Sequence, residues 1–180
     1  PMSEYYYLLS SLPTLREGEP PPFAAAEFLR RCADWLTPEA MAELVALELL
    51  PPVGALPSSC PTIAAWHDWE TDLRNRLAQL RQPAAERDPA LDLRPVGPCF
   101  PDNERALREA LAAATPLERE RQLDRLRWRR LDELEIGWSF GFDRLCVYKL
   151  KLLLAEGWQR RTAEAGRLAL AGVTAGLHRQ

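Results

Sequence analysis

The chain has 180 residues, enough for one folded domain, and its 47% hydrophobic and 27% charged residues are ordinary for a globular protein. A formal net charge of −3 argues against the overall basic field that non-specific nucleic-acid binding needs. Valine and isoleucine together occur only seven times, whereas leucine, alanine, arginine and glutamate dominate. Because strands favour β-branched residues and helices favour unbranched ones, the composition predicts an all-α protein.

The four cysteines, Cys32, Cys60, Cys99 and Cys146, are widely spaced and form no CxxC motif. We expect reduced, mostly buried thiols in place of a disulfide framework or zinc site, and neither a metal nor a cofactor. No apolar stretch reaches the ~18 residues of a membrane span, and no signal peptide is evident, so a cytoplasmic location is expected. Pro1 precedes Met2 and is expected to be a cloning remnant.

Prolines divide the chain into a punctuated first part and a continuous last part. None of the 16 prolines lies after Pro116, so short helices are expected before it and long ones after it. A loop at 13–22 precedes a predicted helix at about 24–36. The Thr-Pro-Glu run at 37–39 predicts a capped helix that continues to about residue 50. This helix is apolar nearly all round, so we expect it at the centre of the core or covered by another subunit.

The Cys-Pro-Thr run at 60–62 predicts a third helix that ends near residue 82. Residues 83–101 contain five prolines and are expected to form a long loop. Two alternatives stay open for this loop. It is mobile, or it is pinned to the surface by apolar side chains, namely Leu91, Leu93, Val96 and Phe100.

Asp102 is expected to cap a helix at about 103–114, and Thr115 with Pro116 predicts the start of a helix that continues to about residue 135. Gly137 is expected to break the chain there, and Ser139 to cap an apolar helix at 140–156. After Gly157, residues 158–177 predict a weaker, alanine-rich helix. The sequence therefore predicts a single domain, residues 2–180, formed by an irregular bundle of about six to seven helices.

Residues 66–70, Trp-His-Asp-Trp-Glu, are the nearest approach to a catalytic cluster. His67 and Asp68 are adjacent, so on a helix they point about 100° apart and do not share a proton easily. A zinc-protease motif would need a second histidine at position 71, which is threonine. We therefore expect Trp66 to lie in the core and His67, Asp68 and Glu70 to be solvated, and we expect no enzymatic activity.

Six arginines lie between residues 118 and 130, and Trp128 is the only aromatic residue among them. Arg121, Arg125 and Arg129 follow at four-residue spacing and would repel one another unless acidic residues flank them, and Arg129 with Glu133 is a favourable pair. A solvated or partner-facing helix is the preferred interpretation, and RNA binding is the alternative.

Lys149 falls within the apolar stripe of the last helix, and Glu156 lies on the same stripe seven residues later. Lys151 falls on the polar side with Asp143 and Arg144. A charge within an apolar stripe must be paired or must reach water. Two alternatives stay open: Lys149 forms a salt bridge with a neighbouring helix, or it is reserved for another protein. The second predicts that Lys149→Met leaves the isolated fold intact.

The triplet Tyr5-Tyr6-Tyr7 places aromatic rings on several sides of the chain. A buried tyrosine keeps a hydroxyl that needs a partner or water. Core packing and an interface with another protein are both consistent with this triplet, and the sequence does not separate them.

Two segments carry a resemblance to a known family. Residues 5–8, Tyr-Tyr-Tyr-Leu, are followed by Ser-Leu-Pro at 11–13 and by Leu15. Near the other end stands Tyr-Lys-Leu-Lys-Leu at 148–152, followed by Trp158 and Gly166. These motifs cover about a quarter of the chain and resemble the opening and closing regions of a bacterial family of unknown function that is typically encoded among the subunits of V-type ATPases.

The resemblance implies a non-catalytic accessory protein, or a short counterpart of the all-helical socket that joins the rotor shaft of the ATPase to its membrane ring. Such a protein works by docking onto other subunits, in the cytoplasm or at the inner membrane through the ATPase. V-type ATPase subunits are the expected partners. A regulatory or scaffold binding module and a small helical enzyme are the alternatives. The expected partner-binding residues are Tyr5, Tyr6, Tyr7, Lys149, Lys151 and Trp158.

Overall fold

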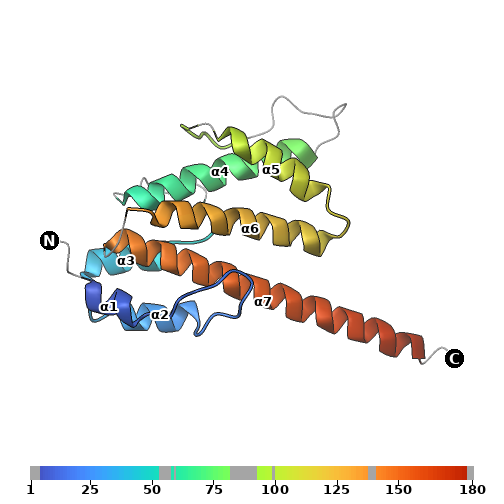
Figure 1. Cartoon of the computed structure of the whole chain (residues 1–180), viewed down its shortest axis with the longest axis horizontal. Coiled ribbons are helices and arrows are strands. Elements are labelled where there is room, and N and C mark those ends of the chain that lie inside the picture. The colour runs from blue at the N-terminus through green and yellow to red at the C-terminus, as the bar shows by residue number, and fades with distance from the viewer. Residues whose placement is uncertain are drawn as a thin grey trace.

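The computed structural model of the chain describes residues 5–52, 58, 60–81, 93–98, 100–137 and 141–177. Across these residues the chain forms helices and no strand, so the predicted all-α class and irregular bundle are confirmed (Figure 1). The helices are α1 (Tyr6–Ser11), α2 (Ala25–Cys32), α3 (Pro38–Ala46), α4 (Pro61–Arg81), α5 (Pro101–Leu111), α6 (Pro116–Glu135) and α7 (Phe142–Leu177).

The two predicted Thr-Pro helix starts are confirmed. The Thr37 hydroxyl accepts a hydrogen bond from the backbone N–H of Ala40 at 3.3 Å, at the start of α3. At the start of α6, Thr115 and Glu118 form a reciprocal capping box, with both hydrogen bonds at 3.1 Å. A side-chain acceptor satisfies backbone donors that the first helical turn leaves free, so these residues determine where each helix begins.

Several predicted boundaries are wrong by a few residues. α2 ends at Cys32 and α3 at Ala46, because Leu47 adopts an extended conformation. The predicted cap at Asp102 is also wrong. Pro101 occupies the first helical position of α5, which places the N-cap on Phe100 and Asp102 within the first turn. A proline in the first turn is compatible with a helix because its missing N–H would be unbonded there anyway.

The predicted break at Gly157 is wrong, because α7 is a single helix of 36 residues. An interior glycine costs a helix only about 1 kcal/mol. A Cβ atom at position 157 would lie 3.8 Å from the guanidinium of Arg161, an ordinary van der Waals contact, so the packing around this position would also accept alanine. Gly137, in contrast, has a φ of +92° and does follow the end of α6, as predicted. The predicted cap at Ser139 lies outside the described residues.

The first half of α7 is the central element of the bundle (Figure 1). α6 and α4 pack against it on one side, α2 and α3 on the other, and α5 covers α4 and α6. The second half of α7 extends past the other helices. The largest fully buried apolar side chains come from six of the helices: Phe28, Leu44, Trp66, Leu73, Leu107, Leu131, Leu145, Leu150 and Leu152.

α3 does not lie at the centre of the core, contrary to one of the two alternatives stated for it. Leu44 and Leu47 are buried, but Val45 is 52% exposed and Leu50, just beyond the helix, is 43% exposed. α3 therefore packs one face on α7 and leaves the other open.

Part of the predicted 83–101 loop is held against α4. The side-chain amide of Asn75 donates to the carbonyl oxygen of Arg94 at 2.7 Å and accepts from its N–H at 3.2 Å. The Arg94 guanidinium donates to the carbonyl oxygen of Pro51 at 2.8 Å. Hydrogen bonds therefore anchor this segment at Arg94, whereas Leu91 lies outside the described residues.

The cysteines that the structure describes, Cys32, Cys60 and Cys146, are buried free thiols, as predicted, whereas Cys99 lies outside the described residues. Burial raises the pKa of Cys32 to about 12. The hydrogen bond with Cys60, together with burial, raises the pKa of Cys146. Within the described part of the chain, no helix combines the length and the apolar character that crossing a membrane requires.

One buried ion pair joins α4 to α6. The Arg127 guanidinium donates to both carboxylate oxygens of Glu70, at 2.7 and 3.0 Å, and the Glu70 side chain is fully buried. Burial alone would lower the pKa of Arg127, but the charge and hydrogen bonds of Glu70 outweigh it and leave the pKa raised. This two-bond geometry satisfies a charge that would otherwise be very costly to bury.

We predict that Arg127→Met destabilises the protein by about 3–5 kcal/mol, because it leaves the Glu70 carboxylate buried without its partner. Urea denaturation followed by circular dichroism measures the loss. Arg108→Met is the matched control, because it breaks an exposed pair with Glu104 and should cost less than about 1 kcal/mol. Equal losses in the two variants would contradict the structural role of the buried pair.

Candidate functional site

The cluster at residues 66–70 is mainly structural. Trp66 is fully buried, as predicted, and its indole N–H donates to the carbonyl oxygen of Leu49 at 3.1 Å. The prediction that Glu70 is solvated is wrong, because this carboxylate is paired with Arg127 inside the bundle. His67 and Asp68 are half-buried, as their positions on the packed helix α4 dictate. Glu70 is therefore committed to a partner and does not join His67 in an acid–base pair.

The buried Nε2 atom of His67 has no hydrogen-bond partner among the residues that the structure describes. Burial lowers the pKa of His67, and the negative charge of Asp68 opposes this only in part. Among the residues that the structure describes, no group of three or more His, Cys, Asp or Glu side chains is placed to hold a metal ion.

Lys149, one of the predicted partner-binding residues, lies inside the bundle and not on its surface. It is only 4% exposed, and its ammonium donates to the backbone carbonyl oxygens of Leu44 at 2.7 Å and Val45 at 3.0 Å. The last carbonyls of a helix have no partner within it, so Lys149 caps the C-terminus of α3. The predicted salt bridge to a neighbouring helix is wrong, because backbone oxygens take the place of a carboxylate.

Two carboxylates of α7 cap other helices in the same way. Glu156 accepts a hydrogen bond from the N–H of Ala25, the first residue of α2, at 2.6 Å. Asp143 accepts from the N–H of Thr62 at 3.3 Å, in the first turn of α4. Carboxylates therefore lie at two N-termini and an ammonium at a C-terminus, which is the arrangement that helix dipoles favour.

Lys151 is also internal. It lies on the same polar side of α7 as Arg144, as predicted, since both bind Glu135, but this side faces α6 and not solvent. It is 6% exposed, and its ammonium lies 2.7 Å from carboxylate oxygens of Asp132 and Glu135. The same ammonium lies 5.4 Å from the ring centroid of Trp128. A helical wheel assumes one solvated face, but α7 is covered on the Lys151 side by α6.

Trp158 is half-buried and lies beside residues 121–125 of α6. The guanidinium carbons of Arg121 and Arg161 lie 5.7 and 5.9 Å from the centroid of its ring. Arg161 also pairs with Asp124. A cavity of about 90 Å³ beside Trp158 is lined by residues of α6, α7 and the loop at 17–19. Trp158 therefore packs among arginines of its own chain.

The arginines of α6 are mostly engaged within the chain. Arg125 pairs with Glu17 at 3.2 Å, and Arg121 packs on Trp158. The predicted pair of Arg129 with Glu133 is wrong, because Glu133 binds Arg130 at 3.0 Å. The intramolecular contacts of this helix reduce the number of cations that it offers to an RNA backbone.

The tyrosine triplet lies at the start of α1. Tyr5 is partly buried and packs against the core, whereas Tyr6 and Tyr7 are 47% and 73% exposed. The Tyr6 and Tyr7 rings form a T-shaped pair with centroids 5.6 Å apart. The triplet thus combines core packing at one residue with surface exposure at the next two.

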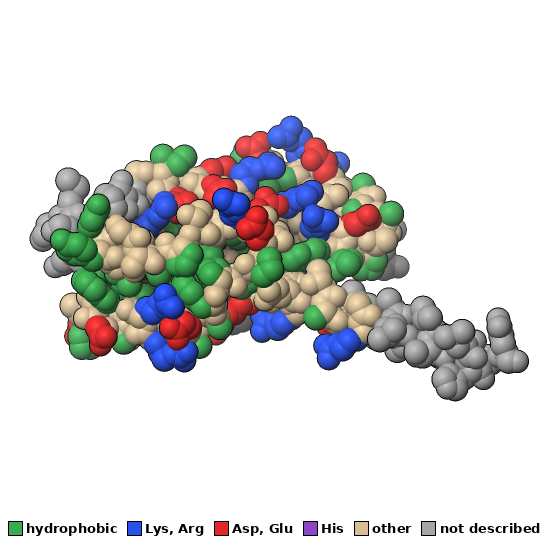
Figure 2. All heavy atoms as spheres, turned by 60° about the horizontal axis from the view of Figure 1, so that its bottom comes forward, with side chains coloured by type: hydrophobic (Ala, Val, Ile, Leu, Met, Phe, Trp, Pro, Cys, Tyr) green, Lys and Arg blue, Asp and Glu red, His purple; other side chains and the backbone are tan. Residues whose placement is uncertain are grey.

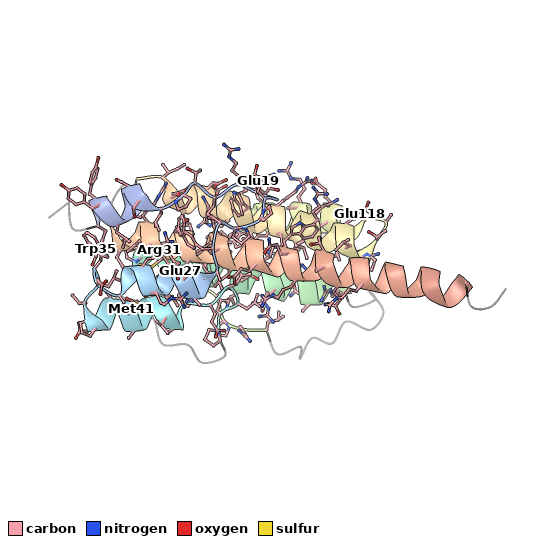
Figure 3. All side chains as sticks on the ribbon, turned by 90° about the horizontal axis from the view of Figure 1, so that it is seen from below. Glu19, Glu27, Arg31, Trp35, Met41 and Glu118 are labelled. Atoms are coloured by element: carbon pink, nitrogen blue, oxygen red, sulfur yellow. The ribbon has the colours of Figure 1, made fainter. Side chains whose placement is uncertain are left out.

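Other exposed apolar side chains lie at the end of the bundle where α1 begins. Trp35, in the turn between α2 and α3, is 46% exposed, and Ile136, just after α6, is 79% exposed. Figure 3 labels Trp35 at this end, and Figure 2 shows hydrophobic side chains gathered there. We call Tyr6, Tyr7, Trp35 and Ile136 the apolar end. Sequence reasoning did not identify Trp35 and Ile136 as exposed. Trp35 lies near the end of the helix predicted at about 24–36, and Ile136 follows the helix predicted to end near residue 135.

The six predicted partner-binding residues do not converge on one site. Lys149 and Lys151 are inside the bundle, Trp158 lies farther along α7, and only the tyrosines reach the apolar end.

No family model matches this chain. Comparison with characterised proteins and with solved structures finds no similar protein either. The resemblance to the family encoded with V-type ATPases therefore depends on the motif residues alone.

We predict that Lys149→Met destabilises the isolated protein by about 1–3 kcal/mol, because it leaves the buried Leu44 carbonyl oxygen without its donor. Denaturation in urea measures the change. Arg160→Met, an exposed substitution on the same helix, is the control and should change stability little. An unchanged unfolding midpoint in Lys149→Met would show that the cap contributes nothing.

We further predict that His67→Gln becomes more stable relative to the wild type as the pH falls. The pKa of His67 in the folded protein is below its ordinary value of 6.5. Below that value the unfolded chain binds the proton more readily, so the wild type loses stability and the variant does not. Unfolding midpoints at about pH 7.5 and about pH 5.5 give the comparison. A difference between the proteins that stays constant with pH would contradict the prediction.

Proposed function

We propose that this protein is a non-catalytic accessory component of a bacterial V-type ATPase, or a short counterpart of the helical socket between its rotor shaft and membrane ring. The partner is suggested by the tyrosine and Tyr-Lys-Leu-Lys-Leu motifs, which resemble the family encoded with the subunits of that proton-transporting enzyme. The protein would act in the cytoplasm, where it would join the inner membrane through the ATPase. Its mechanism would be static: a helical body whose surface docks onto other subunits.

The observation that best supports docking is the apolar end. Tyr7 and Ile136 are the most exposed large apolar side chains that the structure describes, at 73% and 79%. Removing apolar surface from water is favourable by about 25 cal/mol per Å², and tyrosine and tryptophan are common anchors of protein interfaces. The same tyrosine segment carries the resemblance, so the sequence motif and the exposed surface coincide.

The two lysines of the second motif are engaged inside the bundle, so the surface left for docking is the apolar one. Lys149 and Lys151, which the motif alone would offer to a partner, hold α3 and α6 in place. The motif at 148–152 would then preserve the shape of the bundle, while the tyrosines of α1 contact the partner. Tyr148 connects the two segments, because its hydroxyl donates to the carbonyl oxygen of Pro13 at 2.9 Å.

A regulatory or scaffold binding module is the second candidate, because it would use the same apolar end with a different partner. A small helical enzyme has less support. Its best cluster of titratable side chains included Glu70, which is paired with Arg127.

We predict that Tyr7→Ser combined with Ile136→Ser weakens association with the ATPase by roughly tenfold or more, as expected for anchor residues of an interface. The experiment compares co-purification of the native protein with the soluble subunits and with the membrane ring. Leu117→Ser, a 38% exposed apolar residue at the start of α6, is the matched control. Failure of the wild type to associate with either part of the ATPase would overturn the proposal.

A further inference from the structure

A second feature of the surface is a cavity of about 320 Å³ between α4, α5 and α6. Its wall includes the indole of Trp69 from α4, the first turn of α5 at residues 101–103 and the side chains of Arg129 and Arg130 from α6. The cavity shares no residue with the apolar end. Its size lies at the lower limit of pockets that hold small molecules.

The cavity wall carries hydrogen-bond donors that lack acceptors. Trp69 is only 4% exposed and packs on Trp66, with ring centroids 5.4 Å apart, but no group among the described residues accepts a hydrogen bond from its indole N–H. The Nε atom of Arg130 is buried and likewise has no partner. A buried donor without an acceptor is costly, so an acceptor supplied by a ligand would be favoured at the Nε atom of Arg130.

The charge around the cavity is positive. Arg129 is exposed and forms no ion pair with the described residues, whereas Arg130 binds Glu133 at 3.0 Å. Asp102 lies 4.0 Å from the guanidinium of Arg105, so these two exposed charges offset each other. Three arginines thus face two carboxylates along this wall.

The start of α5 also borders the cavity. No side chain caps its first turn, because the N-cap is Phe100 and Pro101 follows, but Asp102 and Glu104 lie in that turn and offset part of its positive charge. The N-terminus of a helix carries a partial positive charge and unbonded N–H groups, which favour an anion. Donors from three helices therefore meet around one space.

We propose that this cavity binds the phosphate group of a small phosphorylated molecule. A phosphate presents several acceptor oxygens in a tetrahedral arrangement, so it can accept from an arginine, an indole N–H and a helix N-terminus that approach from different directions. The paired donors of a guanidinium match two of those oxygens. The volume beyond the phosphate would hold the rest of the ligand. This proposal is independent of docking to the ATPase.

The test measures binding of inorganic phosphate, and then of glycerol phosphate, to the isolated full chain by titration calorimetry at constant ionic strength. We expect saturable binding of both, with tighter binding of the ester. Arg129→Gln should weaken binding roughly tenfold, because it removes a charge-assisted hydrogen bond. Trp69→Phe keeps a ring but removes the N–H, and should weaken binding roughly fivefold.

Arg74→Gln is the matched control, because Arg74 is an exposed arginine of α4 outside the cavity. It should leave the affinity unchanged. In a parallel ¹⁵N–¹H spectrum, the indole signal that disappears in Trp69→Phe should shift when phosphate is added to the wild type.

Three results would overturn the proposal: no saturable binding of either probe, equal weakening by Arg74→Gln and Arg129→Gln, or a Trp69 indole signal that phosphate does not move. If Trp69→Phe fails to fold, the exposed Arg129→Gln variant still decides the question, because its substitution does not alter the core. Failure here would leave ATPase docking unaffected, since that interaction is measured on another surface with another partner.

Discussion

The structure depends on the charged side chains with which α7 closes the ends of three other helices. α2 and α3 have eight and nine residues, and helices of this length are marginal in water on their own. Glu156 supplies an acceptor to the N-terminus of α2, and Lys149 supplies donors to the C-terminus of α3. The two residues are seven positions apart, so they lie on one face of α7 and hold neighbouring helices together. α7 therefore organises the N-terminal third of the chain as well as its own half of the bundle.

Most of the charged side chains that stand out in the sequence form ion pairs within the protein. Arg127 satisfies Glu70, Lys151 satisfies Asp132 and Glu135, and Arg161 satisfies Asp124. Such pairs are weak sources of net stability, but each is costly to break once it is buried. Two features of the described residues are free for contact with other molecules: an apolar surface at one end of the bundle, and a cavity where Arg129 pairs with no described carboxylate.

The parts of the fold that depend on local chemistry could be predicted from the sequence. Thr37 and Thr115 precede prolines, and a cap of this kind acts within four residues, so both helix starts were correct. The partners of Lys149 and Glu70 could not be predicted, because a helical wheel gives the direction of a side chain and not what lies opposite it.

The predicted helix break at Gly157 was wrong for a related reason. The sequence does not show that packing of the first half of α7 carries the helix through this glycine. Trp35 and Ile136 were missed because exposure depends on the tertiary arrangement.

The continuity of α7 through Gly157 has a mechanical consequence. At 1.5 Å per residue, its 36 residues form a rod about 54 Å long, of which only the first half is clamped by the rest of the bundle. A force on the free half is therefore carried along one stiff element to the residues that grip α2, α3 and α4. A hinge at position 157 would have isolated the two halves; an unbroken helix makes them move as one.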